Sequence, residues 1–150
     1  MKFTVDRVDD LQKLDITKLV EESETEGYRF LSRLVDDYKD GTNTFNQPGE
    51  ALFCIRDKGE NIVAIGGVNQ SPFSEDNKVA RLQRFYVEAD ARRQGAGSAL
   101  LKEITDHSRD YFNEITVRTE SSKADAFYRV NGFDFDDSAS ETTHVMNLQK

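Results

Sequence analysis

The sequence is poor in the residues that mark several classes of protein. Two prolines among 150 residues argue against a disordered linker or tail. A single cysteine, Cys54, excludes an internal disulfide, and with only two histidines the chain offers no convincing zinc site. Cys54 lies in the apolar run 51–55, so we expect a buried strand thiol and not a nucleophile. No metal is therefore predicted.

Long apolar runs are missing as well. No stretch approaches the roughly 18 to 20 consecutive apolar residues that a membrane helix needs. Residues 1–6 lack the apolar core of a signal peptide. The sequence therefore predicts a cytoplasmic protein with no membrane partner. Its length and its 37% of hydrophobic residues predict one domain over residues 1–150.

Charge is distributed unevenly along the chain. The net charge of -8, from 20 basic and 28 acidic side chains, opposes binding to nucleic acid. Five basic residues nevertheless gather within 78–93, where only two acids accompany them. This basic island comprises Lys78, Arg81, Arg84, Arg92 and Arg93. A basic island in an acidic protein favours a small polyanionic ligand.

Hydrophobic periodicity predicts the order of the elements. Apolar, partly β-branched runs typical of strands occupy residues 3–5, 52–56, 62–68, 81–87, 115–119, 133–135 and 143–148. Helical patterns run through residues 11–20, 30–38, 100–104 and 122–131. Ser122 and Asp125 have the spacing of a weak capping box for the last helix. The order predicts an α/β (α+β) fold with a mixed sheet of about seven strands flanked by helices.

The most informative segment is Arg92–Ser98, between a predicted strand and a predicted helix. Gly95 and Gly97 let successive backbone N–H groups approach an anion, and the helix N-terminus supplies about half a positive charge. Arg92 and Arg93 add charge-assisted hydrogen bonds suited to phosphate. A flexible turn before an amphipathic helix explains the glycines but not the arginines. The segment therefore predicts a phosphate-binding turn.

Two better-known glycine motifs are excluded because their residue patterns do not match this sequence. A dinucleotide fingerprint needs a third small residue where this chain has Leu100. A P-loop needs Gly-Lys followed by Ser or Thr, and that sequence is absent. NAD and ATP are thus poor choices of ligand.

These residues resemble the GNAT family of acetyl-coenzyme A-dependent N-acetyltransferases. Arg92-x-x-Gly95-x-Gly97 matches the family's pyrophosphate motif, Gln/Arg-x-x-Gly-x-Gly/Ala. Downstream, the pattern Ala-x-x-Phe-Tyr-x-x-x-Gly-Phe of residues 124–133 resembles a helix and strand of the family. The resemblance runs from Leu82 to Phe133. It implies a mostly antiparallel, twisted sheet with splayed central strands, and acetyl-coenzyme A as co-substrate.

The resemblance also implies which residues bind the cofactor. Residues 85–87 would offer backbone groups to the pantetheine arm, and residues 93–98 would wrap the pyrophosphate. The predicted cofactor-binding residues are Phe85, Tyr86, Val87, Arg92, Arg93, Gln94, Gly95, Ala96, Gly97, Ser98 and Ser121. A backbone N–H near Val87 would hold the thioester oxygen. Gly66 and Gly67 suit a bulged third strand near the reacting amine, although close packing also accounts for them.

Tyr128 is the predicted general acid for the leaving thiol. A phenol with a pKa near 10 stays protonated at neutral pH, although a core aromatic is the ordinary alternative. The general base departs from the family pattern, because Thr116 stands where many relatives have glutamate and Ser121 where they have asparagine. Glu120 is the predicted base. Glu88, an acid from the amine-binding half, or an amine that arrives neutral also remain open.

Four acids lie between the first two helices, in the region that often covers the acceptor site in this family. These are Glu21, Glu22, Glu24 and Glu26. With the net charge of -8 they favour a small cationic amine as acceptor, although a solvated loop explains them equally well. A protein or peptide N-acetyltransferase and a non-catalytic coenzyme A-binding regulatory module are the alternatives. The sequence leaves a homodimer open.

Overall fold

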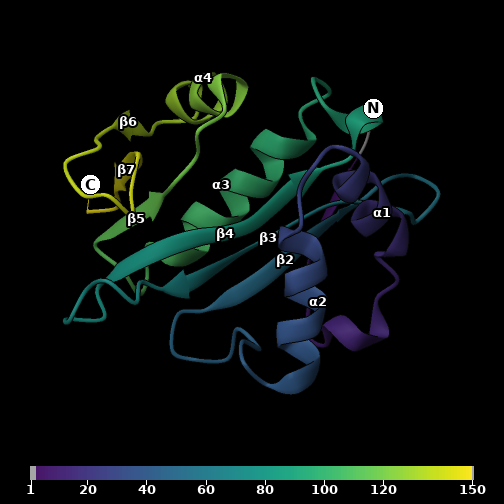
Figure 1. The fold of residues 1–150 in the computed structure, drawn as a ribbon, viewed down its shortest axis with the longest axis horizontal. Coiled ribbons are helices and arrows are strands. Elements are labelled where there is room, and N and C mark those ends of the chain that lie inside the picture. The colour runs from purple at the N-terminus through teal and green to yellow at the C-terminus, as the bar shows by residue number, and fades with distance from the viewer. Residues whose placement is uncertain (1–2, 150) are drawn as a thin grey trace.

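Seven strands form one sheet in the computed structural model, which describes residues 3–149 (Figure 1). The strands are β1 Thr4–Arg7, β2 Ala51–Arg56, β3 Ile62–Gln70, β4 Val79–Val87, β5 Glu114–Val117, β6 Asp134–Phe135 and β7 His144–Asn147. Their order in the sheet is β1-β2-β3-β4-β5-β7-β6. Only the β4–β5 pair is parallel within the described chain. The predicted α+β fold with a mixed, mostly antiparallel sheet is confirmed.

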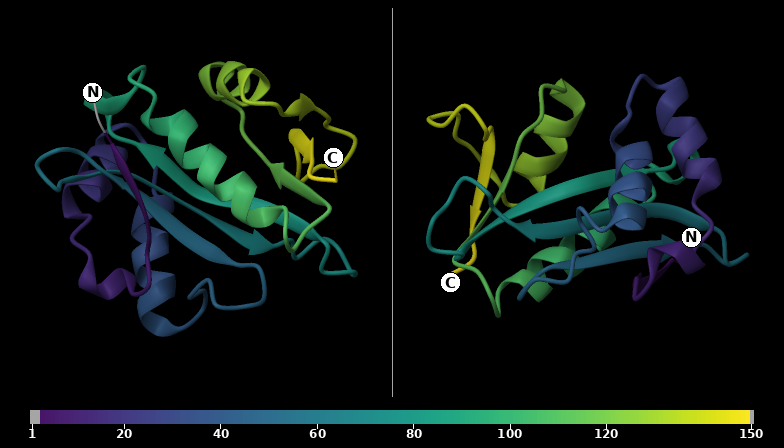
Figure 2. Two further views of the ribbon diagram at one scale, coloured as in Figure 1. Left: turned by 180° about the vertical axis from the view of Figure 1, so that it is seen from behind. Right: turned by 60° about the horizontal axis from the view of Figure 1, so that its bottom comes forward.

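Helices cover both faces of this sheet (Figure 2). They are α1 Thr17–Thr25, α2 Phe30–Asp40, α3 Ala96–Ser108 and α4 Ser122–Val130, with single 3-10 turns at Leu11–Lys13 and Ala89–Ala91. Helices α1 and α2 pack on one face, and α3 packs on the other. The α2 helix ends at Gly41, whose φ of 88° is the left-handed conformation that glycine adopts without strain.

The sheet separates two apolar clusters. On the α3 face, Leu100 and Ile104 pack with strand residues such as Ile115. On the α1 and α2 face, Leu31 and Cys54 belong to the second cluster. Cys54 is buried and unpaired, and burial raises the pKa of its thiol. The predicted buried strand thiol is confirmed. Its raised pKa disfavours the thiolate that nucleophilic chemistry needs.

A β-bulge interrupts the pairing of β3 with β4. Ile65 lies opposite Tyr86, but Gly67 lies opposite Gln83, so two residues of β4 share one partner on β3. The register therefore shifts by one residue across the bulge. Side chains of β4 on either side of it exchange faces of the sheet, because alternation restarts there.

The bulge was predicted in the third strand, and this prediction was wrong. The extra residue belongs to β4, at Arg84 and Phe85 opposite Gly66. Close packing accounts for the two glycines instead. A Cβ at Gly66 would lie 2.8 Å from the Phe85 ring, and one at Gly67 would lie 2.6 Å from the Phe45 ring. Neither distance is sterically acceptable, so both positions need glycine.

The central strands β4 and β5 part after three residues of pairing. Pairing joins residues 79–81 to 114–116, and in the described residues 3–149 the stretch 82–87 has no partner strand on that side. The N–H of Glu88 donates to the carbonyl of Val63 on β3 at 2.8 Å. Since hydrogen bonding alternates along a strand, the N–H and C=O of Val87 point towards the gap. The predicted splayed strands are thus present.

The start of α4 differs by one residue from the prediction. Ser121, not Ser122, is the N-cap, and its Oγ accepts from the N–H of Ala124 at 3.2 Å. The Asp125 carboxylate does not complete a capping box, because its Oδ1 lies 2.6 Å from Nε2 of the buried His144. Asp125 thereby joins α4 to β7.

We expect Gly66→Ala to lower the free energy of unfolding by about 1–3 kcal/mol, because the new methyl group overlaps the Phe85 ring. Urea denaturation measures this change. Gly59→Ala is the matched control, since a Cβ there meets only the ends of two polar side chains at 3.0 Å or more. Equal stability of the two variants would contradict the packing that we describe.

Candidate active site

The turn before α3 presents free backbone donors. Gly95 is the N-cap of α3 with φ 91°, no side chain caps the helix, and Arg93 has φ 64°. Within residues 3–149, none of the six N–H groups of residues 93–98 makes a well-formed hydrogen bond. Ala96 is buried, whereas Gln94 and Ser98 are exposed. Six free donors at a helix N-terminus form a site for an anion.

Gly97 lets this turn approach α4 closely. A Cβ at Gly97 would lie 3.2 Å from the Phe127 ring and 3.4 Å from the side chain of Val87. A Cβ at Gly95 would meet nothing within 4 Å. Gly95 therefore leaves open space in front of the free donors, whereas Gly97 serves packing behind them.

The two arginines of the turn have different surroundings. Arg92 donates to both carboxylate oxygens of Glu26, at 3.1 and 2.6 Å, and its Nε donates to the Val87 carbonyl at 2.9 Å. Its hydrogen bonds hold the pKa of Glu26 below the usual range. Arg93 is exposed and makes no side-chain hydrogen bond or ion pair within the described chain. Arg92 fixes the turn, and Arg93 is available to a ligand.

Tyr86 connects β4 to the same helix α1. Its hydroxyl lies 2.7 Å from Glu22 Oε1 and 2.8 Å from Glu26 Oε1, and Glu22 also accepts from the N–H of Ala89 at 2.9 Å. Burial and the two carboxylates raise the pKa of Tyr86. The predicted cofactor residue Tyr86 thus directs its side chain away from the gap. Sequence reasoning missed this network, whose only signal is the four-residue spacing of Glu22 and Glu26.

Tyr128 lies among aromatic side chains between α4 and β4. It is 6% exposed, and its ring lies 6.4 Å from the Phe85 ring and 5.4 Å from the Phe127 ring, centroid to centroid. Burial raises the pKa of its hydroxyl. The hydroxyl makes no hydrogen bond within residues 3–149. Every fully enclosed polar side-chain atom in those residues has a hydrogen-bond partner, so the Tyr128 hydroxyl is not one of the enclosed atoms. Its proton is therefore free to be donated.

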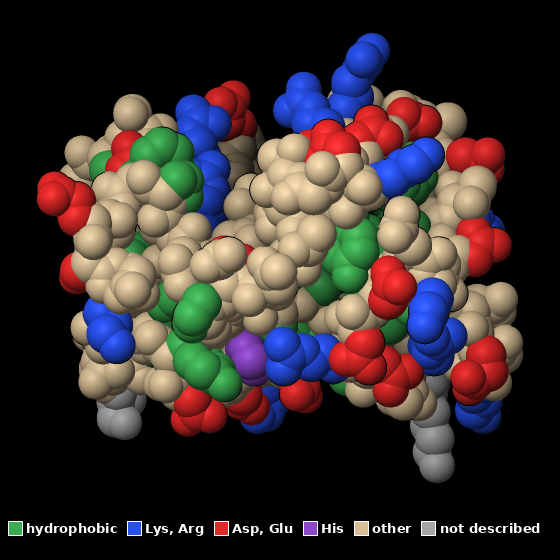
Figure 3. Space-filling view, turned by 90° about the horizontal axis from the view of Figure 1, so that it is seen from below, with side chains coloured by type: hydrophobic (Ala, Val, Ile, Leu, Met, Phe, Trp, Pro, Cys, Tyr) green, Lys and Arg blue, Asp and Glu red, His purple; other side chains and the backbone are tan. Residues whose placement is uncertain are grey.

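The four arginines of the basic island form two groups. Arg92 and Arg93 belong to the turn, whereas Arg84 faces α2, where its Nη2 lies 3.6 Å from Asp37 Oδ2. Arg81 faces the same way, because its strand neighbours belong to the cluster on the α3 face. Seen from below, basic side chains line one wall of a hollow in the surface (Figure 3).

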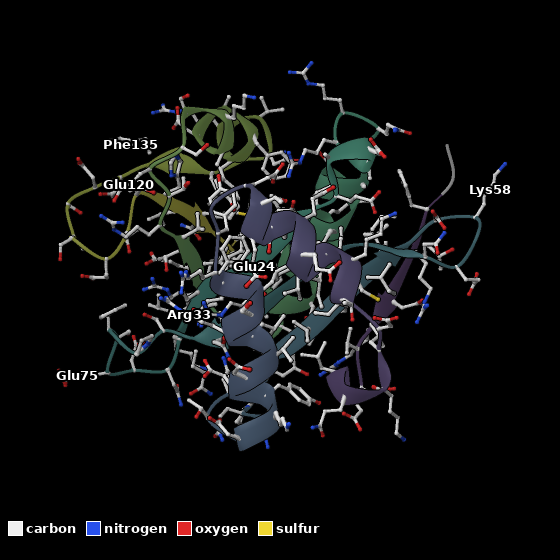
Figure 4. The ribbon with its side chains drawn as sticks, turned by 45° about the vertical axis from the view of Figure 1, so that its right-hand side comes forward. Glu24, Arg33, Lys58, Glu75, Glu120 and Phe135 are labelled. Carbon is white, nitrogen blue, oxygen red and sulfur yellow. The ribbon has the colours of Figure 1, made fainter. Side chains whose placement is uncertain are left out.

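The residues predicted to supply the base and its neighbour have partners of their own. The Glu120 side chain is 78% exposed, projects from the C-terminal half of the chain, and lies 2.9 Å from Arg118 Nη1 (Figure 4). Ser121 caps α4. The Thr116 hydroxyl donates to the Ala80 carbonyl at 3.1 Å. Glu88 is the buried acid at the end of β4, and burial raises the pKa of its carboxyl.

Two further kinds of feature are absent from residues 3–149. No three or more His, Cys, Asp or Glu side chains lie together in a group that would hold a metal ion. No helix there combines the length and the apolar character needed to cross a membrane.

Comparisons with known proteins agree with this geometry. The family model described as "Acetyltransferase (GNAT) family" matches residues 13–133. A protein of Exiguobacterium sp. 255-15 assigned to the acetyltransferases is 26% identical, with 98% of this chain and 94% of that chain covered and a TM-score of 0.89. No curated protein matches the chain significantly.

Two more distant structures share the fold. A GNAT family acetyltransferase of Staphylococcus aureus Mu50 is 18% identical, with 99% of this chain and 100% of that chain covered and a TM-score of 0.75. A GNAT family N-acetyltransferase of Escherichia coli, solved in complex with coenzyme A, is 14% identical, with 97% and 81% covered and a TM-score of 0.74.

We expect Gly95→Val to weaken coenzyme A binding at least about tenfold, because the side chain fills the open space before the free N–H groups. Calorimetry measures the affinity. Gly41→Val is the matched control, since Gly41 also has a positive φ and no atom within 4 Å of its Cβ position. Both variants should cost about 1–2 kcal/mol of stability, and only Gly95→Val should lose affinity. Equal affinities would remove the turn from the binding site.

The two arginines should respond differently to removal. Arg93→Ala should weaken coenzyme A binding about tenfold with stability nearly unchanged, because its guanidinium has no protein partner. Arg92→Ala should lower the free energy of unfolding by about 1 kcal/mol, because it loses the Glu26 and Val87 contacts at a partly exposed site. Calorimetry and thermal unfolding of both variants separate the two roles. If Arg92→Ala lost affinity and Arg93→Ala lost stability, the roles assigned to the two arginines would be reversed.

Proposed function

The chain belongs to the GNAT family of acetyltransferases and is an acetyl-coenzyme A-dependent acyltransferase, and from this premise we propose that it acetylates a primary amine by direct attack in a ternary complex. The observation that carries the proposal is the turn of free N–H groups at the end of a strand that has parted from its neighbour. A diphosphate on the turn leaves an extended arm free to enter the gap.

The proposed binding mode uses mainly backbone groups. The N–H groups of residues 93–98 and the Arg93 side chain hold the diphosphate, with Ser98 and Ser121 at its edge. Backbone groups of Phe85 and Val87 face the gap and bind the pantetheine arm. Arg92 and Tyr86 act as positioning residues, because their side chains bond Glu26 and keep the end of β4 in place.

In the proposed chemical step the amine nitrogen attacks the thioester carbonyl. The C–N bond forms, the carbonyl oxygen becomes an oxyanion held by the N–H of Val87, and the C–S bond then breaks. The departing sulfur takes the proton of the Tyr128 hydroxyl. Tyr128 suits this role because burial keeps it protonated and no protein group within residues 3–149 occupies its hydroxyl. The proton lost by the amine returns to the tyrosinate through the base and solvent.

Two acids compete for the role of base. Glu120 is highly exposed and paired with Arg118, so its carboxylate is directed into solvent. Glu88 is buried at the end of β4, and its raised pKa moves it towards the range in which a carboxylate accepts a proton effectively. We therefore place Glu88 ahead of Glu120, acting through a water molecule.

The four acids were expected between the first two helices, but three lie within α1 and Glu26 caps its end. They give weaker evidence about the acceptor than their charge implies. Glu22 and Glu26 bond Tyr86 and Arg92, and Glu24 accepts from the Ser32 hydroxyl at 2.7 Å. Three of the four acids are thus committed to protein contacts, and the acids alone do not select a cationic amine. A small molecule remains the proposed acceptor, with a protein or peptide amine as the alternative.

Release of thiol from acetyl-coenzyme A tests the proposal. Small amines and peptides with a free amine are added separately to the purified protein, and free coenzyme A is measured with a thiol reagent. Small amines should raise the rate above the background of hydrolysis, and peptides should not. A response to peptides alone would favour the protein-directed alternative, and a response to neither would contradict acetylation of primary amines.

Tyr128→Phe should lower kcat about 10- to 100-fold with coenzyme A affinity nearly unchanged, because only the proton donor is lost. Stability should also stay unchanged, since the hydroxyl bonds nothing within the described chain. Tyr111→Phe, at an exposed tyrosine, is the matched control and should keep full activity. Steady-state rates and calorimetry supply the measurements. Turnover equal to that of the control would remove Tyr128 from the mechanism.

A further inference from the structure

Part of the basic island is not used by the proposed cofactor site. Arg81 and Arg84 lie on the face of β4 that looks towards α2, on the opposite side of the strand from the α3 cluster. The exposed Arg33 of α2 lies close enough to lower the pKa of Arg84. Figure 4 labels Arg33 and shows further nitrogen-tipped side chains beside it. Two elements thus bring three guanidinium groups to one wall.

These guanidinium groups lack hydrogen-bonded acids. Within residues 3–149, the guanidinium groups of Arg33, Arg81 and Arg84 donate no hydrogen bond, whereas those of six other arginines do. The Arg84 side chain is only 19% exposed, and its ion pair with Asp37 Oδ2, at 3.6 Å, is too long for a hydrogen bond. A charge with so little exposure is costly unless an anion meets it. Every fully enclosed polar side-chain atom in residues 3–149 has a hydrogen-bond partner. The guanidinium nitrogens without a partner are therefore not fully enclosed and still reach solvent.

The local charge balance remains positive. Burial is the main cause that lowers the pKa of Arg84, and Arg33 and Arg81 add to it, while Asp37 opposes them. Burial likewise lowers the pKa of Arg81, which lies over the Phe73 ring at 5.0 Å and has Glu141 as its opposing acid. The wall thus holds three guanidinium groups against two nearby acids, Asp37 and Glu141, so an approaching anion would meet a net positive charge.

The backbone at Arg84 is strained. Its φ of 59° falls in the left-handed region, which glycine adopts freely and a bulky residue does not. The bulge holds the residue there and directs its side chain towards α2, immediately before Phe85. An anion on Arg84 would therefore lie next to the segment proposed to hold the reacting thioester.

We propose that the acceptor carries an anionic oxygen group, a carboxylate or a phosphate, in addition to its amine, and that Arg84 holds this group together with Arg81 and Arg33. The inference rests on the proposed transfer to an amine. Guanidinium donors suit both anions, because their fixed fork matches two oxygens at once. The acceptor would thus be an amino acid or an amino phosphate and not a polyamine.

Pairs of amines that differ only in the anionic group test the inference. Tyrosine with tyramine, histidine with histamine and arginine with agmatine test the carboxylate, and phosphoethanolamine with ethanolamine tests the phosphate. Thiol release gives kcat/KM, and calorimetry on protein saturated with coenzyme A gives Kd. At least one anionic member should exceed its partner about tenfold or more in kcat/KM or affinity. If no anionic member exceeds its partner in either measurement, the inference is overturned.

Arg84→Gly separates this role from folding. The change removes the guanidinium and relieves the positive φ, so the variant should unfold at the same temperature or higher. Its preference for the anionic member should fall to within about threefold, since the charge-assisted hydrogen bonds are lost. Arg56→Gln, which breaks a pair with Asp6 at the β1 edge of the sheet, should keep the preference. A preference that survives in Arg84→Gly would overturn the assignment.

The two proposals fail in different ways. Thiol release by no amine, with tighter binding of the anionic members, would contradict acetylation of primary amines and still support the anion site. Thiol release by both members of every pair at equal rates and affinities would support the transferase and overturn the anion site.

Discussion

A strand that loses its neighbour must find other partners for its backbone groups, and this constraint organises the site. Strand β4 bonds β5 over only three residues, after which its N–H and C=O groups on that side face a gap. Arg92 satisfies the Val87 carbonyl. The remaining groups, and the free donors of the turn that follows, are available to a ligand. Parting of two strands thus produces both the slot and the anion site.

The N-terminal helices stabilise this open arrangement. Glu22 and Glu26 of α1 bond Tyr86, Arg92 and the N–H of Ala89, so one face of a single helix holds the end of β4 and the turn behind it. The two acids therefore neutralise the Arg92 charge and accept hydrogen bonds from groups of the protein itself. Their abundance in the sequence is a consequence of folding before it is a signal about the acceptor.

Most of the correct predictions of the fold and the site came from local sequence patterns. The errors concern contacts between residues that are distant in the sequence. The strands, Gly41 at the end of α2 and the turn at Gly95 follow from periodicity and glycine placement. The bulge was assigned to the wrong strand because register belongs to a pair of strands, and an arginine with φ 59° gives no sign of it in the sequence. Likewise, nothing local predicts that Arg92 meets Glu26, 66 residues earlier.

The same long-range pairing decides how the basic island should be interpreted. An overall charge of -8 repels anions at a distance, so an anionic ligand depends on guanidinium groups that meet it at short range. A protein acid already binds Arg92 through two hydrogen bonds, whereas Arg93 at the turn has no ion pair and Arg84 at the bulge has only a longer one, to Asp37 at 3.6 Å. The proposed cofactor occupies the first position. An acceptor anchored at the second would present its amine beside the thioester, because the bulge places Arg84 directly before the strand segment that lines the gap.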